Sequence, residues 1–122
     1  MTKEQALHQF FNSFGIIGYR NTSVPDDVIF PYLTYDAPIS SFEEDPVSIT
    51  LNLYYYTDSE ADPDAKAEEI RNFIGMGGKI MHWGGGAIWF KWGSPWCQSL
   101  VDDTNKNIKR RYINITAEYL TI

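Results

Sequence analysis

The side chains with the greatest chemical potential in this sequence are one cysteine, Cys97, and two histidines, His8 and His82. A thiol beside an imidazole suits covalent catalysis, if the fold brings Cys97 to either histidine. The alternative, which we favour, is that Cys97 is a small apolar side chain that fills space. Zinc needs a closely spaced set of Cys and His ligands, which this sequence lacks. We therefore expect no catalytic residue, no metal and no cofactor.

Two further motifs resemble ion-binding loops but fail at a decisive position. The acidic residues from Asp58 to Glu69 have the spacing of an EF-hand calcium loop, but Pro63 stands where that loop needs glycine. We interpret these carboxylates as the N-cap and acidic first turn of a helix. The run Gly75-Met76-Gly77-Gly78-Lys79 lacks the leading glycine and the final hydroxyl residue of a phosphate-binding loop. It is better interpreted as a helix end and a turn.

Positive charge gathers in one run, where Lys106 precedes Lys109, Arg110 and Arg111. In an extended strand, Lys109 and Arg111 point to one side and Arg110 points to the other. The simplest interpretation is the solvated beginning of a strand. The alternatives are salt bridges to the acidic segment Glu43-Glu44-Asp45 of a neighbouring subunit, or contact with nucleic acid.

Aromatic side chains are unusually dense in one stretch of fourteen residues, which contains Trp83, Trp89, Phe90, Trp92 and Trp96. Trp89 points to one side of its expected strand, and Phe90 and Trp92 point to the other. Both sides could be covered by the chain's own helices. Alternatively, one side contacts another subunit or partner, or stacks on carbohydrate. For an interface we select the three residues Trp89, Trp92 and Trp96, together with Pro95.

The composition indicates a single domain spanning residues 1–122. Hydrophobic residues make up 43% and aromatic residues 16%, which is ample for a core and excludes a disordered chain. Ten basic and sixteen acidic residues give a net charge of −6, which argues against tight binding of nucleic acid. A single cysteine predicts a reducing compartment. We recognise neither a signal peptide nor a membrane-spanning run, so we expect a cytosolic protein.

The hydrophobic spacing predicts seven elements. A capping box at Thr2 and Gln5 precedes a helix over residues 3–14, and Asp62-Pro63 begins a second helix that ends near Gly75 to Gly78. Strands are expected at residues 29–35, 47–57, 79–83, 87–92 and 108–122, with loops over 15–28, 36–46 and 93–107. The order is α-β-β-α-β-β-β. It predicts an α+β fold, in which two helices pack on one face of a mainly antiparallel sheet of four to five strands.

Several of these segments also occur, in this order and at this spacing, in a known protein family. They are Val24-Pro25-Asp26-Asp27 leading into Phe30-Pro31-Tyr32-Leu33-Thr34-Tyr35, the helix that ends in a Gly-Gly turn, the aromatic strand that runs into Ser94-Pro95-Trp96-Cys97-Gln98, and the closing Arg110-Arg111-Tyr112-Ile113-Asn114. Together they cover most of the chain, and they resemble the small tail components of long-tailed phages of Gram-positive bacteria.

The resemblance implies a tail-terminator or tail-completion protein. Such proteins form a ring, typically a hexamer, that caps the tail tube and presents a surface to the head connector. The implied partners are further copies of the chain, the tail-tube protein and the head-connector (stopper) protein. DNA would pass through the lumen without specific binding, and the protein would reside in the tail or neck of the virion after assembly in the host cytoplasm. The family offers no catalytic residues.

Three alternatives stay open at this stage. The chain could be another phage neck protein, acting in head completion or as a tail adaptor. It could be a module that binds a peptide or sugar through its aromatic hairpin. It could also be a small hydrolase that uses Cys97 and a histidine.

Overall fold

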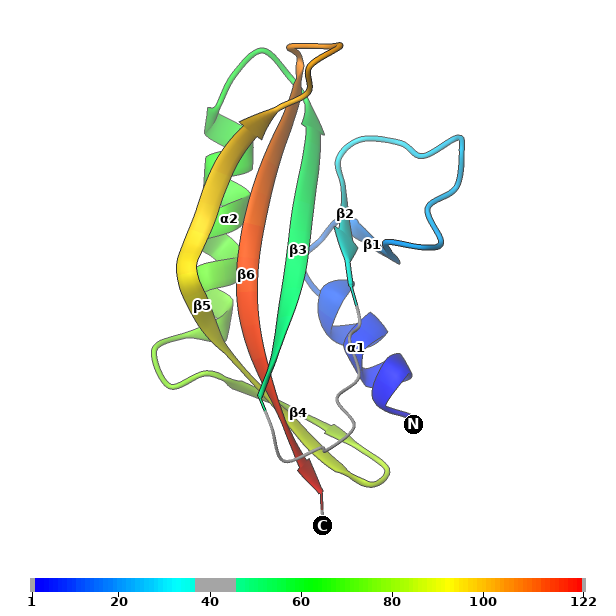
Figure 1. The fold of residues 1–122 in the computed structure, drawn as a ribbon, viewed down its shortest axis with the longest axis vertical. Coiled ribbons are helices and arrows are strands. Elements are labelled where there is room, and N and C mark those ends of the chain that lie inside the picture. The colour runs from blue at the N-terminus through cyan, green and yellow to red at the C-terminus, as the bar shows by residue number, and fades with distance from the viewer. Residues whose placement is uncertain (1, 37–45, 122) are drawn as a thin grey trace.

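The computed structural model describes residues 2–36 and 46–121 (Figure 1). It contains two helices, α1 (Lys3–Phe11) and α2 (Ala61–Ile74), and a sheet of six strands. The strands are β1 (Ile17–Arg20), β2 (Tyr32–Tyr35), β3 (Val47–Tyr56), β4 (Lys79–Trp83), β5 (Gly86–Val101) and β6 (Ile108–Thr121). The α+β class agrees with the expectation from the sequence.

The sheet is mixed, and its strand order is β1-β2-β3-β6-β5-β4. β1 pairs with β2 in parallel, and the other four pairings are antiparallel. The expected sheet of four to five strands, and the element order that went with it, are therefore wrong in detail. β1 lies inside the stretch 15–28 that we expected to be a loop, and the expected strand over 29–35 begins only at Tyr32.

β1 depends on contacts that no local pattern reveals. Gly18 is buried beneath the end of α1, where a Cβ atom would lie 2.6 Å from the carbonyl oxygen of Phe11. The side-chain amide of Asn12 then binds Gly18 as a neighbouring strand would. Its Oδ1 accepts from the Gly18 amide at 2.9 Å, and its Nδ2 donates to the Gly18 carbonyl at 3.2 Å. The outer edge of β1 is thus capped at this residue.

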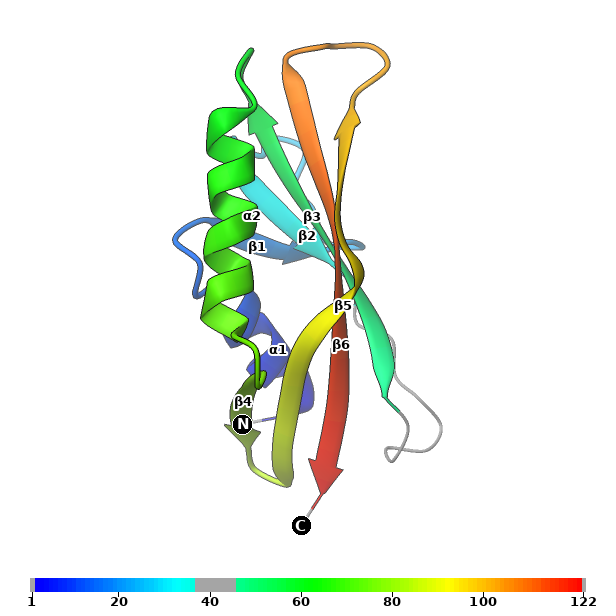
Figure 2. The same ribbon diagram turned by 90° about the vertical axis from the view of Figure 1, so that its left-hand side faces the viewer.

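The expected loop over residues 93–107 is also corrected, because β5 continues to Val101. The register between β5 and β6 shifts between Trp92 and Cys97, so this stretch forms a bulge within the strand. At Gly93 a Cβ atom would lie 2.6 Å from the Asn114 carbonyl oxygen, so glycine permits the close approach. β5 bends strongly along its length (Figure 2).

Both helices lie on the same face of the sheet, as the sequence predicted (Figure 2). α1 has the expected capping box at Thr2 but ends at Phe11 instead of residue 14. Its rings fill the core: Phe10 stacks on Phe90 with centroids 3.8 Å apart, and Phe11 stacks on Tyr35 at 4.4 Å. Stacked buried rings contribute packing energy beyond the area they bury.

α2 covers the other half of this face with a buried apolar stripe of Ala67, Ile70 and Ile74. It begins one residue before the expected N-cap, at Ala61, and Glu60 occupies the cap position without a side-chain hydrogen bond. Along the strands, buried residues beneath the helices alternate with partly exposed residues on the other side, most clearly in β3 and β6. Among the described residues, no helix is long and apolar enough to span a membrane.

Candidate interaction surface on the uncovered face of the sheet

The opposite face of the sheet carries no helix in the described part of the chain (Figure 2). Alternation along the strands sends a group of aromatic rings to this side. Most of them are half-exposed, and Tyr56 is 57% exposed. We call this group the aromatic face; it consists of Tyr19, Phe30, Tyr32, Tyr54, Tyr56 and Tyr112.

The aromatic face is organised by ring contacts across neighbouring strands. Tyr32 and Tyr54 are partners in the β2–β3 register, and their rings stack with centroids 4.8 Å apart. Tyr19 on β1 meets Tyr32 edge-on at 6.2 Å, and Phe30 lies between Tyr32 at 5.3 Å and Tyr56 at 5.9 Å. These contacts restrict the rings within the chain itself. Side chains that are restricted in this way lose less conformational entropy on binding.

Arg110 is the cation of this surface. Its Nε donates to Asn52 Oδ1 at 2.8 Å. Its guanidinium carbon lies 5.9 Å from the ring centroid of Tyr54 and 6.0 Å from that of Tyr112. The guanidinium therefore lies among aromatic rings, and arginine and tyrosine are both frequent at protein interfaces.

The sequence contains a signal for this surface, although we selected other aromatics. In the alternating strand over residues 47–57, Tyr54 and Tyr56 fall on the more polar side. Exposed tyrosine at such positions indicates a contact surface, because tyrosine provides apolar area with a polar atom that can remain solvated.

The tryptophans selected from the sequence mostly contact their own chain. Trp92 and Trp96 pack against the core on the helix-covered side. Trp92 Nε1 donates to the Arg71 carbonyl at 2.8 Å, and the Arg71 guanidinium carbon lies 4.1 Å from its ring centroid. Trp96 Nε1 is buried and has no hydrogen-bond partner among the described residues. Their role in an interface remains a prediction.

Trp89 and Pro95 lie outside this packing. Trp89 is half-exposed; its Nε1 donates to the Gly77 carbonyl at 2.9 Å, and Lys91 Nζ lies 4.0 Å from its ring centroid. Pro95 is exposed in the β5 bulge, and its carbonyl accepts from Asn114 Nδ2 at 2.8 Å. These two residues are accessible to a partner.

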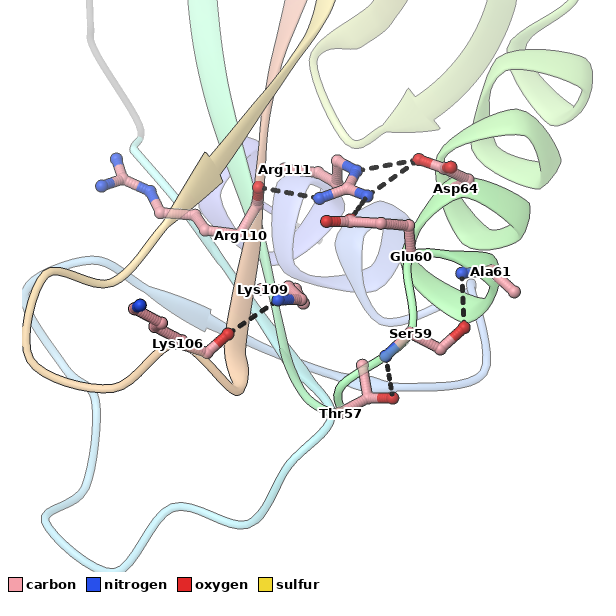
Figure 3. Close-up of polar contacts among 9 residues, drawn as sticks. All are labelled: Thr57, Ser59, Glu60, Ala61, Asp64, Lys106, Lys109, Arg110 and Arg111. Atoms are coloured by element: carbon pink, nitrogen blue, oxygen red, sulfur yellow. Dashed lines mark hydrogen bonds and ion pairs between the residues drawn. The ribbon is translucent and has the colours of Figure 1, made fainter.

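The basic run separates as its alternation predicted (Figure 3). Arg110 projects to the uncovered face, whereas Arg111 is only 1% exposed and lies beneath α2. Lys109 donates from Nζ to the Lys106 carbonyl at 2.7 Å. The acidic segment Glu43-Glu44-Asp45, expected to pair with these cations in a neighbouring subunit, lies outside the described residues.

Arg111 is held by the first turn of α2. Its Nε and Nη2 donate to Asp64 Oδ1 at 3.0 and 2.9 Å, and Nη2 also donates to Glu60 Oε2 (Figure 3). Burial of the guanidinium lowers its pKa, but the hydrogen bonds to Glu60 and Asp64 outweigh burial and raise the pKa above its ordinary value. The ion pairs therefore fix α2 to β6, so Arg111 is unavailable for an interface.

The structure separates the groups considered for catalysis. His82 is exposed and pairs with Ala87 near the start of β5, whereas Cys97 lies beyond the bulge opposite Ile113. His8 Nδ1 lies 3.4 Å from the Tyr35 hydroxyl on α1's side of the sheet. Burial raises the pKa of the Cys97 thiol, which favours the less reactive protonated form. Within residues 2–36 and 46–121, no cluster of three or more His, Cys, Asp or Glu could hold a metal ion.

A groove of about 460 Å³ lies between the end of α1, the start of β1 and the segment before β2. Two exposed isoleucines, Ile17 at 57% and Ile29 at 81%, stand at its walls. Phe30 belongs both to this groove and to the aromatic face, so apolar surface continues from one to the other.

Comparisons of the chain with protein-family models, with curated proteins and with solved structures found no match.

Proposed function

We propose that this protein is a structural, ring-forming tail terminator of a long-tailed phage, which caps the tail tube and joins it to the head connector. The observation that supports the proposal best is the aromatic face. A sheet whose second face carries preordered, half-exposed tyrosines is suited to association with another protein surface. The sequence resemblance supplies the identity of the assembly.

The proposal assigns the chain to assembly and assigns it no reaction or cofactor. Its proposed partners are the tail-tube protein, the head-connector (stopper) protein and other copies of itself, which form a hexameric ring. The net charge of −6 suits a lumen through which DNA slides, because negative subunits repel phosphates and do not hold them. The mature location is the neck of the virion.

The direct test is to interrupt the coding sequence with a nonsense codon in the phage genome that carries it. Loss of a terminator predicts DNA-filled heads without attached tails, together with tail tubes of uncontrolled length, in electron micrographs of the lysate. The wild-type gene supplied in trans restores complete virions. A triple variant, His8→Ala, His82→Ala and Cys97→Ala, is expected to restore them as well. Normal virions from the interrupted genome would contradict the proposal.

The same surface gives a specific reason to keep a second candidate, a module that binds a peptide or sugar. Preordered tyrosines beside an arginine also suit such ligands. The two functions differ in what the purified protein does with a tail. A terminator co-sediments with tail tubes, whereas a binding module does not. Removal of a binding module also leaves the number and length of the tails unchanged.

If another neck role applies, the heads and not the tails are defective. A head-completion protein or tail adaptor leaves tails of normal length after its loss, because tube growth is stopped by a different protein. Measuring the tail-length distribution therefore separates a terminator from these relatives.

A further inference from the structure

Charge is distributed unevenly between the two sides of the sheet. The segment from Asp58 to Arg71, which contains α2, has six acidic and two basic side chains and a net charge of −4, out of −6 for the whole chain. Arg111 offsets part of this from beneath. With Arg111 counted, this segment and its buried cation keep a net charge of −3, so α2 and its surroundings remain acidic.

The uncovered face carries few charged groups, and it lacks the acidic excess of α2. On its described strands, Lys91 and Glu118 form an ion pair at 3.1 Å, and Arg110 adds a positive charge among the aromatic rings. Two such faces brought together would offer Arg110 no surplus of negative charge. The acidic side of α2 is the complementary surface that the chain itself offers.

We propose that the aromatic face of one copy binds the acidic outer side of α2 of a second copy, centred on Arg110. This inference rests on the proposed function and specifies its subunit contact. Glu68 pairs with Arg71 at 3.8 Å and Glu69 with Lys66 at 2.8 Å. Their side chains are still 61% and 57% exposed, so each can accept a further arginine of a second copy. Apolar surface accompanies them, because Phe73 is 38% and Met76 is 91% exposed at the end of the same helix.

The two surfaces lie on opposite sides of the sheet (Figure 2). A contact between them is therefore head-to-tail: each copy uses one surface towards the copy before it and the other towards the copy after it. Such contacts close into a ring when the rotation between copies fits. Continuation of the sheet beyond β1 is less suitable, because Asn12 already occupies the backbone groups of Gly18 at that edge.

Charge reversal tests the contact. Self-association of the full chain is measured by sedimentation velocity over a concentration series, for the wild type, for Arg110→Glu, and for the double variant Glu68→Lys with Glu69→Lys. Each reversal is expected to weaken self-association at least tenfold. Asp103→Lys, on the exposed turn between β5 and β6, is the matched control and is expected to leave association unchanged.

The decisive sample combines all three substitutions in one chain. The new carboxylate at position 110 then faces the new ammonium groups on α2 of the next copy, so association recovers to within about threefold of the wild type. Thermal unfolding of every variant shows whether the fold is retained. A Glu68→Gln, Glu69→Gln and Arg110→Gln series repeats the comparison with smaller perturbation if a reversal unfolds the chain.

Association that persists after Arg110→Glu, or that does not recover in the combined variant, overturns the proposed contact. The terminator function is not contradicted by that result if the wild-type protein still forms rings and caps tail tubes. Conversely, self-association can recover in the combined variant while the phage genome with the nonsense codon still yields normal virions. That pair of results supports the contact and contradicts the terminator function.

Discussion

The two faces of this sheet use aromatic residues in different ways. The covered face is filled by phenylalanine and aliphatic side chains: Phe10, Phe11 and Phe90 are fully buried and in ring contact. The uncovered face carries mainly tyrosine, whose rings contact one another while the side chains stay partly exposed. A phenyl ring gains most from complete removal from water, whereas a phenol keeps a hydroxyl that needs a polar partner. One face therefore holds the fold, and the other is available to bind.

The largest contrast is expected from removing one ring on each face. Phe90→Ala deletes a fully buried ring stacked on Phe10 and should lower the free energy of unfolding by about 3–5 kcal/mol. Tyr54→Ala removes a half-exposed ring and should cost only about 1 kcal/mol. Urea unfolding followed by circular dichroism measures both. Equal losses would show that the uncovered face is as important to the fold as the core.

A second comparison concerns the buried cation beneath α2. Replacing its partners, with Glu60→Gln and Asp64→Asn together, leaves the guanidinium of Arg111 buried without a counter-charge and should cost about 3 kcal/mol. Arg111→Met removes the charge itself at similar volume and should cost less than the double variant. Urea unfolding again gives both values. The reverse ranking would mean that the guanidinium is hydrated in solution.

Substitution of two tryptophans of β5, Trp92 and Trp96, tests whether a ring that packs on the core also contributes to an interface. Trp92→Ala loses the hydrogen bond to Arg71 and the stacking of its guanidinium, so we expect a cost of about 2 kcal/mol. Our sequence-based prediction is that Trp92→Ala and Trp96→Ala weaken ring formation more than folding. Unfolding and sedimentation measured on the same samples decide this. Loss of the fold at ambient temperature would show that these rings act only in the core.

The last expected effect is absent near neutral pH and appears only in the alkaline pH dependence of stability. Burial raises the pKa of Tyr55 to about 12 from 10.0, helped by the nearby carboxylates of Asp62 and Glu69. The folded state therefore keeps a proton that the unfolded chain releases. This stabilisation is complete below pH 10 and is lost as the pH rises towards 12. Tyr55→Phe should flatten the alkaline decline in unfolding free energy, and an unchanged slope would exclude Tyr55 as its source.

The parts of the fold that the sequence predicted are those with a regular local pattern. β3 and β6 alternate without interruption, and α2 has apolar residues at helical spacing, so all three elements were predicted near their observed positions. The end of α1 was placed too late because Phe14 is buried and continues the apolar spacing, although it lies beyond the last helical residue. Burial of a side chain does not require that its backbone be helical.

The candidate surface was predicted less well than the fold. Our selection followed the density of tryptophan in β5, and Trp92 and Trp96 pack mainly on their own chain. The tyrosines that form the aromatic face come from β1, β2, β3 and β6, and from the segment before β2. They are distant in sequence and meet only because the strands pair in the order observed.

The sequence by itself determined which residues of a strand share a face, which residue types fill the core, and the overall negative charge. The first follows from local periodicity, and the other two follow from side-chain chemistry. Tertiary structure alone decided that Asn12 completes β1, that β5 passes through a bulge, and that acidic and tyrosine-rich surfaces lie on opposite sides of one sheet. These features depend on hydrogen bonds and close approaches between distant segments. No window of neighbouring residues contains that information.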